Sequence, residues 1–243
     1  MGFHGSQRIE FPIKRYGLRG GFSVLIVVAI STLLWSQDAV VEGTVTVVHH
    51  STSETGNGDV VVSLTPLRPG GVSPGHLARL VQKNKKFTPH VVAVTPGTEI
   101  EFPNQDLFFH SVFSIHQGKT FDLGLYESGA ARKVKFTQPG ISYIFCNIHP
   151  EMSAVVLVLR TGYFTLTGQE GSFQIDRVPP GRYKLEVWYE QASEAELAAQ
   201  GQEVEVVSGA NTLARITLHS SDAPQEHLNK HGEPYYAGKA KGQ

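Results

Sequence analysis

The fold of this chain is decided by a short stretch in its second half, residues 138–152, which read QPGISYIFCNIHPEM. A Pro-Gly turn signal opens it, and the apolar run that follows predicts a strand at Ser142–Phe145. Cys146, His149 and Met152 then come at intervals of three residues. We expect these three residues on one tight loop directly after the strand, close enough to surround a single atom.

Sulfur-containing residues are scarce in this chain, which makes that loop unusual. The 243 residues include one cysteine and two methionines, and one methionine is the initiator. A single cysteine excludes an intrachain disulfide, and a lone cysteine is most often a small buried hydrophobic residue. Because Cys146 lies six positions from Met152 with His149 between them, a metal-binding role is favoured over simple burial.

A second informative stretch, residues 87–113, reads FTPHVVAVTPGTEIEFPNQDLFFHSVF. It predicts strands at His90–Val94 and Glu99–Phe102 around a Pro-Gly turn. An Asn-x-Asp motif follows, and then His110, which we expect on a loop. His110 is therefore the candidate fourth partner of the later loop.

The rest of the chain after residue 40 also predicts an all-β protein, because short alternating runs are separated by Pro-Gly turns. Ser193–Gln200 is the one exception, either a short helical turn or a polar loop. The other expected strands are Val41–Val48, Val60–Leu67, Val134–Phe136, Ala154–Leu159, Ser172–Ile175, Tyr183–Trp188, Gln202–Val207 and Thr212–Leu218.

On these two stretches, residues 76–159 resemble the cupredoxin family, with the short Cys-x-x-His-x-x-Met spacing of amicyanin-like members. The stretch 121–129 (FDLGLYESG) adds similarity to cupredoxin-containing proteins labelled as methylamine-utilisation proteins. The resemblance implies a Greek-key β-sandwich. It also implies that the backbone N–H after the first histidine, here at Ser111, donates to the cysteine sulfur, although the family usually has Asn at that position.

The flanking segments resemble a second family, the carboxypeptidase-regulatory-like or transthyretin-like sandwich. The stretches that show this resemblance are GTVTV (43–47) and VVVSL (60–64) before the cupredoxin-like segment and TGQEGSFQIDRVPPGRYKLEVW (167–188) after it. We therefore expect a second β-sandwich split into residues 40–67 and 160–219, with the cupredoxin-like segment inserted after its second strand. Residues 220–243 form a polar tail that we expect to be extended.

The four candidate ligands His110, Cys146, His149 and Met152 match the donor set of one type 1 (blue) copper: two imidazoles, a thiolate and a weak axial thioether. Pro150 stiffens the loop that carries three of them. Zinc is the next metal to consider, but its sites rarely include a thioether. A cysteine nucleophile with a histidine base remains a further alternative, although no local nucleophile signature is present.

The N-terminal residues 1–39 predict an export signal. A basic leader precedes the apolar run Phe22–Trp35, which has the length of a signal-peptide core and is short for a membrane-spanning helix. Cleavage and retention as a membrane anchor both remain open. Either way, we expect the copper domain in the periplasm or elsewhere outside the cytoplasm.

These features predict an exported electron carrier rather than an enzyme, because four protein ligands leave no open position for a substrate. Expected partners are redox proteins, some of them membrane-bound, which would dock on an apolar patch around His149 formed by Phe108, Phe109, Ile148 and Pro150. The formal net charge of −1 gives no indication of nucleic-acid binding. Two alternatives are a copper-binding or delivery protein without a redox role, and a carbohydrate-binding or adhesion module.

Other residues carry weaker hypotheses. The pairs His49-His50 and His227/His231 are candidates for a second metal site, against the more common case of solvated loop histidines. Tyr183, Trp188 and Tyr189 are candidates for a sugar platform, against the simpler interpretation of a strand with one core face. The sequence does not decide whether Tyr235-Tyr236 in the tail contacts a sandwich.

Overall fold

The computed structural model describes residues 38–49, 56–68, 77–115, 118–221 and 227–235. The chain divides into two units, Met1–Trp35 and Ser36–Gln243, and the described residues all belong to the second. The expected leader, residues 1–39, lies outside the described residues except for its last two. Within the described ranges, no helix has the length and apolarity needed to cross a bilayer.

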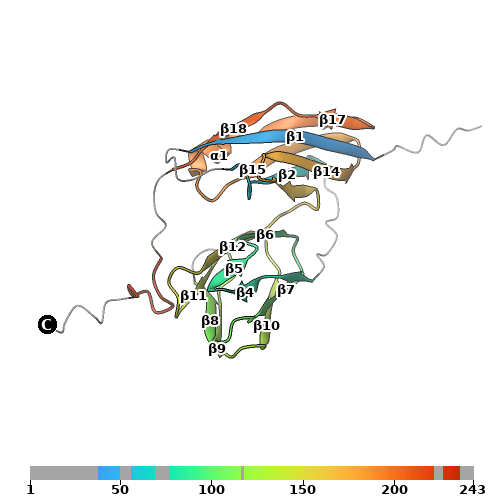
Figure 1. Ribbon diagram of the computed structural model, residues 1–243. Coiled ribbons are helices and arrows are strands. Elements are labelled where there is room, and N and C mark those ends of the chain that lie inside the picture. The colour runs from blue at the N-terminus through green and yellow to red at the C-terminus, as the bar shows by residue number, and fades with distance from the viewer. Residues whose placement is uncertain (1–37, 50–55, 69–76, 116–117, 222–226, 236–243) are drawn as a thin grey trace, which may run out of the picture. The chain divides into compact units, whose positions relative to one another are not determined.

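The described chain is nearly all-β, as predicted, and its strands form two sandwiches (Figure 1). In the first sandwich, one sheet has the order β14-β1-β17, with β18 also pairing β1, and the other has the order β13-β2-β15-β16. These strands are β1 (Ala39–Val48), β2 (Val61–Pro66), β13 (Phe164–Leu166), β14 (Ser172–Val178), β15 (Gly181–Trp188), β16 (Gln202–Val206), β17 (Ala210–Thr212) and β18 (Ile216–His219).

Strands from the two ends of the described chain complete each other in this sandwich, as the split interpretation requires. β1 pairs β14 with Gly43 opposite Phe173, and β2 pairs β15 with Leu64 opposite Leu185. Figure 1 shows β1 side by side with β17 and β18, and both of those pairings are parallel. Without the strands that follow residue 163, β1 and β2 would lack their hydrogen-bonded partner strands. The exact domain boundaries remain predictions.

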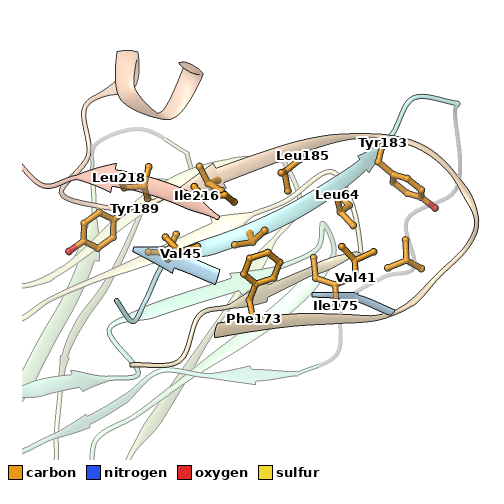
Figure 2. Close-up of a cluster of buried hydrophobic side chains, with 14 of the residues drawn as sticks. Val41, Val45, Leu64, Phe173, Ile175, Tyr183, Leu185, Tyr189, Ile216 and Leu218 are labelled. Atoms are coloured by element: carbon orange, nitrogen blue, oxygen red, sulfur yellow. The ribbon is translucent and has the colours of Figure 1, made fainter. Parts of the chain in front are cut away.

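Alternation along these strands places one face in a shared apolar core. Figure 2 shows side chains such as Val45, Leu64, Phe173 and Ile216 turned toward one another between the two sheets. Gly43 interrupts the alternation of β1 for a steric reason, because a Cβ there would lie 2.7 Å from Cζ of Phe173. The ring thus fills the place of a side chain on β1.

The second sandwich contains the two stretches that resemble cupredoxins. One sheet has the order β10-β7-β3 and the other the order β6-β12-β11-β8-β9, beside a β4-β5 hairpin. The strands are β3 (Ala78–Arg79), β4 (Val81–Lys83), β5 (Lys86–Thr88), β6 (Val91–Val94), β7 (Thr98–Pro103), β8 (His110–Ser114), β9 (Phe121–Tyr126), β10 (Ala131–Phe136), β11 (Gly140–Cys146) and β12 (Ser153–Val158). Its core holds fully buried aromatic rings together with Cys146 and Met152.

A third, smaller cluster joins residues of both sandwiches. Val61 of β2, Val91 of β6, and Val155 and Leu157 of β12 are buried together. These residues point away from the two main cores, since their neighbours along the strands belong to those cores. Burial on both faces explains why β12 (SAVVLV) is almost continuously apolar and why β2 (VVSLTP) opens with two adjacent valines.

One local expectation needs correction, and one that the sequence left open is answered. Thr212–Leu218 is not one strand, because residues 213–215 separate β17 from β18 and the two strands pair with different parts of β1. Ser193–Gln200, which the sequence left open, contains the helix α1 (Glu194–Gln200), and the Ser193 hydroxyl caps it by accepting from the N–H of Glu196.

Candidate metal centre

Three of the four predicted ligands converge at one end of the cupredoxin-like sandwich. Cys146 Sγ lies 3.6 Å from Nδ1 of His110 and 3.7 Å from Nδ1 of His149. Among the described residues, this is the only group of three or more His, Cys, Asp or Glu whose ligand atoms all lie within 4.8 Å of one another. His110 and Cys146 are fully buried, and His149 is partly exposed.

These separations fit a single metal ion. Ligands about 2.0–2.3 Å from an ion at trigonal angles lie roughly 3.5–4.0 Å from one another. Both sulfur–nitrogen distances fall in that interval. The donor set, two imidazoles and one thiolate with a buried thioether nearby in the chain, suits copper better than zinc.

The strands place the ligands more firmly than a loop would. His110, expected on a loop, is instead the first residue of β8, and Cys146 is the last residue of β11. The two strands are neighbours, with Cys146 opposite Val112. The backbone positions of both side chains are therefore determined by sheet register.

Met152 closes the loop that begins at Cys146. Its N–H donates to the carbonyl of His149 at 3.0 Å, and its carbonyl accepts from the N–H of Cys146 at 3.2 Å. Its side chain is completely buried in the same apolar cluster as Cys146. The loop therefore folds back on itself and returns to the strand β12, while the role of Met152 as an axial ligand remains a prediction.

The surroundings of Cys146 favour its thiolate. Burial alone would raise the pKa of this thiol, but the His110 ring and the backbone N–H groups of Ser111, Ile148 and His149 lower it below its usual value. Ser111 contributes through its backbone, and its carbonyl also accepts from the N–H of Asn147 at 2.8 Å. Burial and the neighbouring His110 lower the pKa of His149, which keeps that imidazole neutral and able to bind a metal.

Asp106 contacts a predicted ligand, and sequence reasoning assigned it no role. Its Oδ2 accepts from Nε2 of His110 at 2.9 Å, which leaves Nδ1 of that ring facing the sulfur. Burial alone would raise the pKa of Asp106, but donors from the N–H groups of Lys85 and Asn84 and from His110 lower it. A carboxylate that orients a ligating histidine in this way is typical of metal sites.

Asn104, the other half of the Asn-x-Asp motif, holds the backbone of Asp106 in place. Its Oδ1 accepts from the N–H of Asp106 at 3.0 Å, and its Nδ2 donates to the carbonyl of Phe108 at 2.8 Å. The motif itself was the available signal, because a short polar pair just before a candidate ligand is where an orienting group would be expected.

The outer side of the centre is apolar. Phe108 packs against both imidazoles, with ring centroids 5.3 Å from His110 and 5.3 Å from His149. Phe108, Phe109 and Ile148 of the predicted patch are all exposed, and Leu107, which the prediction did not include, is 93% exposed. Pro150 is only partly exposed.

Part of the polar tail contacts the loop Cys146–Met152 and the strand before it. The His227 ring stacks on Phe145 with a centroid distance of 3.9 Å, and its Nε2 lies 2.6 Å from the carbonyl of Pro150. The Tyr235 hydroxyl donates to the carbonyl of Cys146 at 3.0 Å. The described part of the tail, residues 227–235, is thus folded against the loop in turns and not extended as expected.

Among the described residues, the weaker candidates are not assembled into sites. Tyr183 and Tyr189 are buried in the first sandwich, as expected for a strand with one core face. The two tyrosines therefore do not form an open platform with Trp188. His49 Nε2 donates to the carbonyl of Gly56, and His50 lies outside the described residues. His227 is engaged with the ligand loop, as described above.

Comparisons with known proteins find similarity in structure alone. No family model matches the chain, and no match was found among curated proteins. Among solved structures, a purple cupredoxin from Nitrosopumilus maritimus is 21% identical, with a TM-score of 0.31, and the match covers 34% of this chain and 99% of that one. An amicyanin from Paracoccus versutus is 19% identical with a TM-score of 0.31, covering 40% of this chain and 91% of that one.

A third match is a copper-containing nitrite reductase from Thermus scotoductus, 24% identical with a TM-score of 0.33, covering 38% of this chain and 25% of that one. These three matches are to cupredoxins, and each covers only about two fifths of this chain or less. At these scores the matches add nothing to the case for a metal centre, which depends on the geometry of the residues themselves.

Proposed function

We propose that this protein is an electron carrier that binds one type 1 copper through His110, Cys146, His149 and Met152. The observation that carries the proposal is the convergence of two imidazole nitrogens on one thiolate sulfur, at 3.6 and 3.7 Å, within a buried site. Copper would supply the one-electron couple. The protein's contribution is a ligand set that changes little between the two oxidation states.

Three of these side chains have distinct tasks in this proposal. Cys146 holds its charge against burial through the N–H groups that surround its sulfur. His110 is kept in one orientation by Asp106. His149, the partly exposed ligand, forms the port through which electrons enter and leave, and the exposed ring of Phe108 lies directly against it.

The exposed residues Leu107, Phe108, Phe109 and Ile148 form the docking patch, which excludes water around that port when a partner binds. The expected partners are other redox proteins. Transfer between proteins requires only brief contact, so a small apolar patch is sufficient.

The proposal is tested by visible and EPR spectra of the copper-loaded chain, followed by voltammetry. We expect an intense thiolate-to-copper colour that bleaches on reduction, and a reversible one-electron couple. Bound copper without a reversible couple would favour the copper-delivery alternative. Glycan binding that is indifferent to copper would favour the carbohydrate-binding alternative.

We propose further that the copper domain lies outside the cytoplasm, free or tethered through Phe22–Trp35, on the strength of the basic leader and apolar run in the sequence. A phosphatase that is active only when exported, fused after residue 70, should be active. An inactive fusion would contradict this location, and the mass of the mature N-terminus would distinguish cleavage from anchoring.

A further inference from the structure

We propose that residues 227–235 form a strap that holds the ligand loop in its metal-binding shape, with His227 and Tyr235 as the positioning residues. We call this segment the tail strap, and the loop Cys146–Met152 the ligand loop. The inference rests on the proposed copper site, but the contacts that carry it lie in the protein and do not depend on a bound ion.

The tail strap contacts the ligand loop at two places, the first residue Cys146 and Pro150. The Tyr235 hydroxyl donates to the carbonyl of Cys146 at 3.0 Å, and Nε2 of His227 lies 2.6 Å from the carbonyl of Pro150. A carbonyl only accepts, so the His227 nitrogen facing Pro150 must carry the proton. Nδ1 of the same ring then faces the Tyr235 hydroxyl at 3.4 Å. The two tail side chains thus bridge the loop from Cys146 to Pro150, on either side of His149.

Packing adds to these hydrogen bonds. The His227 ring lies nearly parallel to the ring of Phe145, at 17° and 3.9 Å between centroids, and its edge meets Tyr235 at 86°. Phe145 is the residue before Cys146 on β11 and is almost fully buried. The strap therefore covers the last strand residue before the ligand loop.

A separate pair of contacts anchors the middle of the tail strap. The N–H of Lys230 donates to Oδ1 of Asn147 in the ligand loop at 3.0 Å, and its Nζ pairs with Asp122 of β9 at 2.9 Å. Asn229 closes a turn around this point by bonding with Gly232 and Glu233. Contacts to two different strands and a loop make this a built interface and not a single chance approach.

These contacts predict a mechanical role. The ligand loop carries three of the four proposed ligands, and it has to open before copper can leave. A strap that holds the carbonyls of Cys146 and Pro150 raises the cost of opening. It also limits how far the loop rearranges when the charge of the metal changes, which is the property that a carrier needs.

The experiment compares three variants of the full chain with the unaltered protein: a chain that ends at Ser221, Tyr235→Phe, and the matched control Tyr183→Phe. The control also removes one tyrosine hydroxyl, which donates to the carbonyl of Pro179 in the other sandwich at 2.6 Å. Hydrogen exchange of the Ile148 and His149 amides is measured without metal, because both N–H groups point at the Cys146 sulfur. Release of copper from the loaded protein to a strong Cu(I) chelator is measured in parallel.

We expect exchange at these amides to accelerate by about fivefold in Tyr235→Phe, the factor for one hydrogen bond of ordinary net strength, and at least tenfold in the shortened chain. Copper release should accelerate in the same order, and Tyr183→Phe should leave both rates unchanged. Unchanged exchange in the shortened chain would overturn the strap. An equal increase in the Tyr183→Phe control would also overturn it, because the effect would then be general destabilisation. Faster exchange in a protein that binds no copper would keep the strap and refute the proposed function.

Discussion

The two imidazoles of the metal centre are held in opposite ways. His110 is fully buried on a strand, and a carboxylate fixes its orientation. His149 lies on a partly exposed loop, and its position depends on an aromatic neighbour and on the surrounding loop. The buried side of the centre is thus held by charge and sheet register, and the exposed side by packing and by hydrogen bonds to the backbone of the loop. In the proposed carrier, this contrast places rigidity where the metal would be anchored and access where electrons would cross.

The largest effect should come from Cys146, which belongs to both sides because it ends a strand and begins the loop. Cys146→Ala should abolish the colour and most of the copper affinity, since the thiolate is the only charged ligand in the set. Visible absorption after copper loading measures this. A variant that stays coloured would show that another group supplies the thiolate-like donor.

On the buried side, Asp106→Asn should weaken copper binding by about 10–100-fold, because an amide cannot hold the His110 ring through a charged hydrogen bond. Competition with a chelator measures the affinity. Asp176→Asn is the matched control, an exposed carboxylate that bonds only to Gln174 in the contacts described, and it should bind copper as the unaltered chain does. Equal affinities for the two variants would mean that Asp106 does not orient a ligand.

On the loop side, Met152→Leu should retain copper and raise the reduction potential, because loss of a weak donor to Cu(II) disfavours the oxidised state. Leucine has a similar volume and can fill the buried site that Met152 occupies. Voltammetry measures the shift. Complete loss of copper would show that the thioether is a strong ligand, and a lowered potential would show that it does not act on the oxidised state.

Sequence reasoning found the cluster of His110, Cys146 and His149 because most of its signals are local. Cys146, His149 and Met152 lie within seven residues, and strand alternation and turn residues mark β11 on the preceding side. The nearly all-β fold was predictable for the same reason. Asp106 was within reach, since it sits in a short motif four residues before His110.

What the sequence could not show depends on distant contacts. His227 meets the carbonyl of Pro150 across 77 residues, and no local pattern in a polar tail indicates which loop it will contact. The break between β17 and β18 is of the same kind, because it follows from pairing with two parts of β1 and not from a breaker residue. The burial of both faces of β2 likewise depends on a neighbouring sandwich.

The smallest expected effect lies where the far end of the ligand loop meets the other sandwich. His90, just before β6, faces the carbonyl of Ser153, one residue past Met152, through Nδ1 at 3.1 Å. Its Nε2 pairs with Glu190, which follows β15, and Asp59 adds a more distant negative charge. The hydrogen bond with Glu190 is the main reason that the pKa of His90 lies above its usual 6.5, against the opposing effect of burial.

Because the folded protein raises this pKa, the stabilisation is complete below about pH 6.5 and is lost as the pH rises through the folded value. Both side chains are partly exposed, so the contribution to the free energy of unfolding should be a few tenths of a kcal/mol to about 1 kcal/mol. Denaturant unfolding of His90→Gln, Glu190→Gln and the double variant between pH 5 and about pH 9 would measure it. The difference between the unaltered chain and His90→Gln should shrink with rising pH, and it should be nearly pH-independent when Glu190 is already Gln. A difference that persists unchanged at high pH would mean that His90 acts through packing and the Ser153 contact alone. The far end of the ligand loop would then be held without a contribution from the charge of His90.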